Sequence, residues 1–163
     1  MTANPYDPLK RTDLSRREQI LLRFTAEVLH GTNTALIDTL VAADYRQHTH
    51  GVGQGREGIR KYIAEIASRR PGREQWRPVL LFEDGDFVIL FKQLPAFLIV
   101  DIVRFNAQDQ LAEHWDVVQS LPAADYDPMA PSKEDLQRFF ALVGIARSRR
   151  SAPTRAAEVA ARG

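Results

Sequence analysis

The chain has 163 residues, of which 44% are hydrophobic and 26% charged. This length and composition fit one globular domain and argue against two domains, a fibre or a disordered chain. The net charge of +1 gives no general attraction for nucleic acid or anionic lipid, and the basic excess is concentrated at the C-terminal end, where five arginines and one glutamate follow from Arg147 onward. The absence of cysteine excludes disulfides, thiolate nucleophiles and cysteine-based metal sites.

The N-terminal sequence has no apolar leader, and no apolar run approaches the roughly 18 residues of a membrane span. We therefore expect a cytoplasmic protein with no membrane or nucleic-acid partner.

Helices are predicted in the first half of the chain. Ser15-Arg16-Arg17-Glu18 is typical of a capping box, and apolar residues at helical spacing predict a long first helix over 13–30. The same spacing predicts a second helix over 33–42 and a third over 56–68. Between these two, the alternating segment from Asp44 to His50 predicts a short strand.

Strands are predicted in the second half, where β-branched and aromatic runs alternate with turn-forming segments. Their ranges are Trp76–Phe82, Phe87–Lys92, Ala96–Asn106 and Leu111–Ser120. The separators suit hairpins, which predicts an antiparallel meander. Helices followed by strands indicate an α+β fold, and a curved meander wrapped around the long first helix would leave an apolar cavity open at one end.

The ends of the chain lie outside this core. Residues 1–12 are expected to form a lead-in, and a capping sequence with an apolar stripe predicts a C-terminal helix over 132–147 that packs against the domain. Residues 148–163 have no apolar stripe and are expected to form a basic, mobile tail. The prediction is one domain over 13–147.

The most informative feature is charged chemistry inside apolar strands. Asp101 interrupts the run from Phe97 to Phe105, and His114 and Asp116 interrupt the run that begins at Leu111. Charges are rare in such settings because desolvating them costs several kcal/mol.

Whether these side chains meet depends on strand register. A two-residue turn through Ala107-Gln108 places Asp101 opposite His114, so that Asp101, His114 and Asp116 share one face. A three-residue turn places Asp101 opposite Trp115 and sends His114 and Asp116 to the other face. In the first register, burial and like-charge repulsion are expected to raise the pKa of at least one carboxyl group towards that of a general acid or base.

A structural interpretation of the same residues is also open: Asp101 forms an ion pair with His114 or Arg104, and Asp116 faces solvent. His48 and His50 have a spacing that can ligate a metal, but a third ligand would be needed, and no metal site is predicted. The glycine-rich turn over 51–55 lacks the sequence of a phosphate-binding loop and is expected to be a connector.

The order of these segments resembles the SnoaL-like polyketide cyclases of the nuclear transport factor 2-like superfamily. The motifs that carry the resemblance are Tyr45-Arg46-Gln47-His48, Asp84–Val88, Asp101–Phe105 and the most specific one, Glu113–Gln119, within roughly residues 14–129. The resemblance implies a cone-shaped barrel of curved antiparallel sheet wrapped around the long N-terminal helix. It also implies aldol closure without a cofactor, with Asp116 moving the proton.

Two other groups of that superfamily are similar in part. Ketosteroid isomerases have an Asp matching Asp101 that stays protonated and donates to the enolate oxygen, which favours the two-residue turn, but their Tyr donor corresponds to Phe24 and their Asp base falls near Thr49. Limonene epoxide hydrolases need an Arg and a second Asp one strand earlier, where this chain offers Lys92, so an epoxide hydrolase-like enzyme ranks third.

We therefore predict a cofactor-independent acid/base enzyme of the lyase or isomerase class, acting on a largely apolar, carbonyl-containing small molecule. Asp116 would remove a proton next to the carbonyl, while Asp101 or His114 donates to the enolate oxygen. The residues expected to bind the substrate are Phe24, Tyr45, Gln47, His48, Thr49, Val103 and Val118.

The alternative is a non-catalytic ligand-binding or dimerisation module of the same fold. A cavity lined by the polar residues supports catalysis, whereas one filled by side chains such as Phe24, Phe97 and Phe105 supports the module. A homodimer is expected in either case, because Leu98, Val100, Ile102 and Trp115 would make the outer sheet face apolar.

Overall fold

The computed structural model describes residues 6–69 and 76–121. The elements in chain order are α1 (Arg16–Arg23), a π-helical turn (Phe24–Leu29), a 3-10 turn (Thr34–Leu36), α2 (Ile37–Leu40), β1 (Val41–Gln47), α3 (Gly55–Arg69), β2 (Arg77–Asp84), β3 (Phe87–Leu94), β4 (Phe97–Phe105) and β5 (Leu111–Ser120). The predicted helix over 132–147 and the tail over 148–163 lie outside the described residues.

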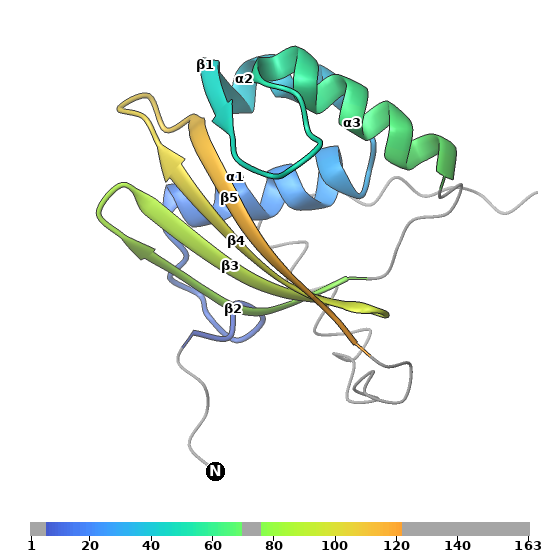
Figure 1. The fold of residues 1–163 in the computed structure, drawn as a ribbon. Coiled ribbons are helices and arrows are strands. Elements are labelled where there is room, and N and C mark those ends of the chain that lie inside the picture. The colour runs from blue at the N-terminus through green and yellow to red at the C-terminus, as the bar shows by residue number, and fades with distance from the viewer. Residues whose placement is uncertain (1–5, 70–75, 122–163) are drawn as a thin grey trace, which may run out of the picture.

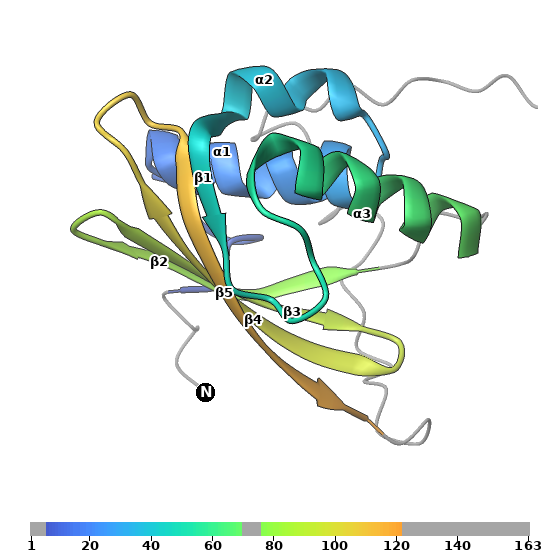
Figure 2. The ribbon, with the colours of Figure 1, turned by 45° about the horizontal axis from the view of Figure 1, so that its top comes forward.

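The five strands form one sheet in the order β1-β5-β4-β3-β2. Strands β2 to β5 are the predicted antiparallel meander, and β1 joins β5 in parallel. The sheet is strongly curved, and the helices gather on one side of it (Figures 1 and 2). The predicted α+β class is therefore confirmed, with an open sheet whose two edges, β1 and β2, do not meet.

The first helix begins as its sequence predicts. The Ser15 side chain accepts from the Glu18 backbone N–H, and the Glu18 carboxylate accepts from the Ser15 backbone N–H, which completes the capping box. After Arg23 the helix widens into the π-helical turn, where the His30 N–H donates to the Thr25 carbonyl oxygen at 3.0 Å. Such turns displace side chains from regular helical positions and are frequent at functional sites.

The pairing of β4 with β5 follows neither of the two registers considered above along its whole length. Asn106 and Gln110 close a three-residue turn in which Asp109 adopts the left-handed conformation, φ 55°. That turn pairs Phe105 with Leu111, the register that would separate the polar side chains. A β-bulge then shifts the pairing by one residue between Arg104 and Phe105.

The bulge has a direct consequence for the two strand faces. Beyond it, Asp101 pairs with Asp116, and Val103 pairs with His114. The two-residue turn was therefore the wrong prediction, but Asp101, His114 and Asp116 still share the inner face. The extra residue, Ala112, is buried. A single inserted residue thus determines whether the polar side chains meet.

The core lies between the inner face of the sheet and the helices. Its fully buried side chains include Leu21, Leu22, Val28, Ile37, Ile63, Leu81, Leu90, Phe105 and Leu111. Among the described residues, no helix combines the length and apolarity needed to cross a membrane.

Candidate active site

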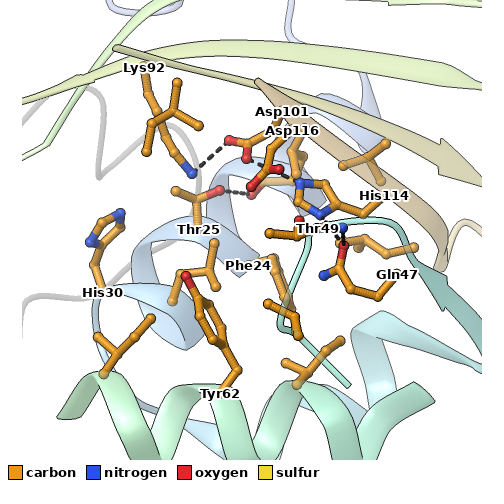
Figure 3. A pocket seen from close by; sticks show the side chains of 18 of the residues that line it. Phe24, Thr25, His30, Gln47, Thr49, Tyr62, Lys92, Asp101, His114 and Asp116 are labelled. Carbon is orange, nitrogen blue, oxygen red and sulfur yellow. Dashed lines mark hydrogen bonds and ion pairs between the residues drawn. The ribbon is translucent and has the colours of Figure 1, made fainter. Parts of the chain in front are cut away.

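A cavity of about 110 Å³ lies between the inner face of the sheet and the helices (Figure 3). A buried water needs roughly 10–15 Å³ by the same measure, so the cavity has room for roughly seven to ten waters or a compact organic molecule. Its helix side is largely apolar and includes Phe24, Leu29, Ile59, Tyr62 and Ile66, whereas its sheet side carries Lys92, Asp101, His114 and Asp116.

Most of the predicted site residues line this cavity. They are Phe24, Tyr45, Gln47, Thr49, Val103, Asp101, His114 and Asp116. Two are placed elsewhere. His48 lies on the outer face of the sheet, where it bonds Glu113 at 2.8 Å and stacks on Trp115, and Val118 is 52% exposed and does not line the cavity. The expected contact of these two side chains with a substrate is not supported by this arrangement.

Asp101 is buried, and each of its carboxylate oxygens lies close to a nitrogen of another side chain. Its Oδ2 lies 2.6 Å from Lys92 Nζ, and its Oδ1 lies 3.2 Å from His114 Nε2. Burial alone would raise the pKa of Asp101, but the Lys92 charge and the His114 hydrogen bond outweigh it and hold the pKa at about 2. The pKa rise predicted for at least one carboxyl group therefore does not occur at Asp101. An ionised carboxylate cannot donate a proton, so Asp101 does not play the part of the protonated isomerase aspartate.

The His114 ring is held by acceptors on both sides. Its Nδ1 lies 2.9 Å from Gln47 Oε1, which also accepts from the Thr49 backbone N–H at 3.0 Å. Because a backbone N–H can only donate, the atom of the Gln47 amide that faces Thr49 and His114 must be the oxygen. The amide nitrogen, Nε2, then points the other way and donates to the Tyr45 hydroxyl at 3.3 Å. Both His114 nitrogens thus face pure acceptors, an arrangement that a ring carrying both N–H protons satisfies.

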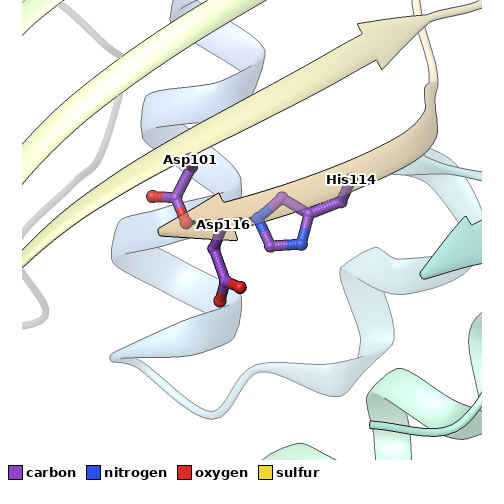
Figure 4. Close-up of side chains that lie close together, drawn as sticks. All are labelled: Asp101, His114 and Asp116. Atoms are coloured by element: carbon purple, nitrogen blue, oxygen red, sulfur yellow. Dashed lines mark hydrogen bonds and ion pairs between the residues drawn. The ribbon is translucent and has the colours of Figure 1, made fainter. Parts of the chain in front are cut away.

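The Asp116 carboxylate differs from Asp101 and His114 in its hydrogen bonding. One oxygen of Asp116, one of Asp101 and a ring nitrogen of His114 lie within 4.8 Å of one another (Figure 4). Within residues 6–69 and 76–121, however, no hydrogen bond or ion pair satisfies the Asp116 carboxylate. It is the free carboxylate of the site, and it faces the cavity. A carboxylate that faces a cavity without a hydrogen-bond partner among the described residues can accept a proton from a ligand.

Sequence reasoning did not assign Lys92 to the site. Lys92 is 4% exposed and follows Val88 and Leu90 at the inward positions of β3, ahead of Leu94. Strand alternation alone could have placed it on the inner face beside Asp101. Its charge is the reason that the buried Asp101 can remain ionised.

The π-helical turn is the second missed feature. Phe24, Thr25, Leu29 and His30 all line the cavity from this turn. His30, which the sequence suggested to be a helix-end residue, stacks on Trp76 with ring centroids 5.4 Å apart. No pattern of apolar residues distinguishes a π-helical turn from ordinary helix, so the sequence carried no usable signal.

A metal or cofactor has little to bind here. Asp101, His114 and Asp116 are the described group whose ligand atoms lie close enough for a metal ion. Lys92 already neutralises Asp101, however, and both His114 nitrogens are occupied by Asp101 and Gln47. A bound cation would have to displace these contacts, so the donor set fits a salt-bridged cluster better than a metal site.

The Tyr45 hydroxyl stays neutral beside these groups. Burial, and then the negative charges of Asp101 and Asp116, raise the pKa of Tyr45. The hydroxyl accepts from Gln47 and keeps its own proton available to the cavity.

This combination of fold and site defines an α+β protein with an acid/base cluster in a curved sheet, and solved structures share its fold. A candidate SnoaL-like polyketide cyclase from Shewanella putrefaciens superposes with a TM-score of 0.56 at 11% identity, over 90% of this chain and 99% of that chain. A candidate isomerase of the SnoaL-like family from Agrobacterium tumefaciens superposes with a TM-score of 0.54 at 17% identity, over 64% and 99%.

A third structure, a SnoaL-like protein of unknown function from Burkholderia thailandensis, has a TM-score of 0.54 at 11% identity, over 68% of this chain and 100% of that chain. The predicted SnoaL-like resemblance is thus confirmed at the level of the fold. No protein-family model and no curated protein matches the chain. A shared fold does not determine an activity, so the function must be argued from the site.

Proposed function

We propose that this protein is an acid/base enzyme that moves a proton next to a carbonyl group in a compact, largely apolar molecule, in an aldol-type cyclisation or an isomerisation. The observation that carries the proposal is the Asp116 carboxylate, which lacks a partner among the described residues and lines an apolar cavity beside the linked Lys92, Asp101 and His114 side chains. The SnoaL-like neighbours named as candidate cyclases and isomerases support the same class of reaction.

In this mechanism Asp116 removes the proton from the carbon next to the carbonyl. The electrons of that C–H bond move into the carbonyl group, which becomes an enolate. In a cyclisation the enolate carbon then forms a C–C bond to a second carbonyl carbon, and protonated Asp116 returns its proton to the new alkoxide. In an isomerisation the proton returns to a different carbon. Either route leaves Asp116 as it began.

The other members of the cluster have supporting roles. Asp101 pairs with Lys92, and both His114 nitrogens already have partners in Gln47 and Asp101, so the contribution we assign to these two residues is electrostatic. Gln47 keeps the ring in position, because its oxygen accepts from His114 and from the Thr49 backbone.

An open cavity lined by Asp101, His114 and Asp116 supports this proposal over a non-catalytic module whose interior is filled by side chains. Phe24 lines the cavity without closing it, and Phe105 lies in the core. A module filled by these side chains would have no hollow beside Asp116. The expectation of a homodimer through the outer sheet face remains a prediction.

The test is exchange of carbon-bound hydrogen for deuterium in D₂O, followed by NMR on a panel of small cyclic ketones and 1,3-diketones. We expect the protein to accelerate exchange for at least one compound. Asp116→Asn should lower that rate by about 10²–10⁴-fold, because the general base is lost. Glu113→Gln, which changes a carboxylate on the outer face of the same strand, is the matched control and should retain the rate.

An equal exchange rate in Asp116→Asn and the unmodified protein, with both folded, would overturn the proposal. Absence of acceleration over free carboxylate buffer across the whole panel would also count against it.

A further inference from the structure

The site holds hydrogen-bond donors for which the described residues provide no acceptor. The Lys92 ammonium has three N–H groups, and among the described residues its partner is Asp101 Oδ2 at 2.6 Å. The Lys92 side chain is 5% exposed, and it lines the cavity. Its remaining N–H groups therefore have the cavity, and whatever occupies it, as their source of acceptors.

The position of Lys92 in the sheet places it beside the proposed base. On the inner face, Lys92 comes from β3, Asp101 from β4 and Asp116 from β5, three adjacent strands. Figure 3 shows the Lys92 nitrogen directed at Asp101, with Asp116 next to that carboxylate and the cavity below both. A molecule in the cavity that touches Asp116 is therefore within reach of the ammonium.

Two other donors are available, but they are neutral. The Tyr45 hydroxyl has an unused proton, and the buried Thr49 Oγ1 has no hydrogen-bond partner in the described part of the chain. Both belong to β1 or the loop that follows it, on the opposite side of the cluster from β3. A hydrogen bond from a cation stabilises a developing negative charge about twice as strongly as one from a neutral group.

We propose that the Lys92 ammonium binds the substrate oxygen on which negative charge develops when Asp116 removes the proton. This inference rests on the proposed function. It adds a hydrogen-bond donor to the developing enolate oxygen, a role that we do not assign to Asp101 or His114. The ion pair with Asp101 holds the Lys92 ammonium at the inner face of the sheet. The carbonyl oxygen lies at Lys92, the acidic C–H bond lies at Asp116, and the apolar remainder lies against Phe24 and Tyr62.

This geometry defines a substrate class. The carbonyl group and the acidic C–H bond must be adjacent, since one molecule has to reach both groups from a small cavity. The best fit is a compact enolisable ketone or 1,3-dicarbonyl compound whose enolate is neutralised by the ammonium. A simple ester, whose enolate is much harder to form, is a poorer fit.

The experiment uses 4-nitrophenolate, a compact planar oxyanion that resembles an enolate and whose absorbance reports its ionised form. Binding is measured in the Asp116→Asn background, because a neutral side chain there imitates the base after it has taken the proton. Lys92→Met should weaken binding by about 10–100-fold, the usual loss for a hydrogen bond to a charged group. Asp101→Asn, which leaves Lys92 in place, should bind at least as tightly as the parent.

The combined variant Lys92→Met/Asp101→Asn separates two explanations. If Lys92 holds the oxyanion, binding stays as weak as in Lys92→Met. If Lys92 only neutralises Asp101, removing both charges restores binding to the parent level, and the inference is overturned. Because this variant leaves no unpaired charge in the cluster, it also carries the test if Lys92→Met fails to fold.

Failure of the proposed function gives a different result. Phenolate binding requires no turnover, so parent-like binding in Lys92→Met, together with loss of deuterium exchange in Asp116→Asn, removes Lys92 from the mechanism and leaves Asp116 as the base. Absence of phenolate binding in both the parent and Asp101→Asn also overturns the role of Lys92. Unchanged exchange in Asp116→Asn instead contradicts the proposed function itself.

Discussion

Each face of the sheet at β4 and β5 carries a row of three linked side chains, a cation, a carboxylate and an imidazole, but the two rows lie in different surroundings. On the inner face Lys92 bonds Asp101, which bonds His114. On the outer face Arg104 bonds Glu113, which bonds His48. In each row the carboxylate is the central member.

Burial separates the two rows in their physical effect. The inner pair has side chains that are 5% and 7% exposed, so its charges interact in a medium of low polarity. On the outer face Arg104 is 38% exposed and His48 43% exposed, so water screens their charges. The inner face also has Asp116, a carboxylate without a partner among the described residues, whereas the outer face has Trp115 at the corresponding place. Similar residues therefore line a cavity on one face, where we propose that the chemistry occurs, and lie at the surface on the other.

Among substitutions that test this difference between the two faces, the largest expected effect is the loss of stability when the buried cation Lys92 is removed. Lys92→Met leaves Asp101 charged, buried and without its cation, and should lower the free energy of unfolding by about 3–5 kcal/mol. Arg104→Met removes a partly exposed partner of Glu113 and should cost less than about 1 kcal/mol. Urea unfolding of both variants measures the difference. Equal losses would mean that burial does not distinguish the two rows, and Lys92→Met/Asp101→Asn should recover most of the loss.

The acid side of the stability curve should show a smaller effect. The folded-state pKa of Asp101, about 2, lies below the usual aspartate value of 3.8, so ionised Asp101 favours the folded state above about pH 4. That contribution, about 2 kcal/mol, should disappear as the pH falls from about 4 to about 2. Urea unfolding at several pH values should show this slope in the unmodified protein and a shallower one in Asp101→Asn. An identical slope in both proteins would assign the acid sensitivity to other groups.

The smallest effect is expected on the outer face. His48→Gln removes a ring that stacks on Trp115 and bonds Glu113, both at the surface, and should change the free energy of unfolding by less than about 1 kcal/mol. Deuterium exchange should keep its rate, because His48 does not line the cavity. A loss of exchange comparable to that of Asp116→Asn would show that the outer face takes part in the reaction.

Much of the fold was accessible from local patterns. The capping box at Ser15 and the four strands of the meander were predicted because these features depend on neighbouring residues and on a period of two. The strand β5 has the predicted bounds, and Asp101 lies on the inner face with Val103 and Phe105, as alternation requires.

The candidate site could be predicted from the sequence only in part. Asp101, His114 and Asp116 stood out because charge is costly inside apolar strands, but their meeting depended on the bulge at Ala112. The pKa rise predicted for at least one carboxyl group does not occur at Asp101, because Lys92, from another strand, is its partner. The π-helical turn that lines the cavity from Phe24 onward left no mark in the apolar spacing.

Although the helix predicted over 33–42 ends at Leu40 and the strand predicted over 44–50 is β1 over Val41–Gln47, the sequence by itself determined which residues are apolar, roughly where most helices and strands lie, and which strands contain charge. These are properties of short segments, and they follow from side-chain chemistry and backbone geometry. Only the tertiary structure decided which charges pair, because a one-residue bulge sets the face of every residue after it. It brought Lys92 to Asp101 and left the Asp116 carboxylate facing the cavity, since electrostatic partners on separate strands meet only when the sheet has formed.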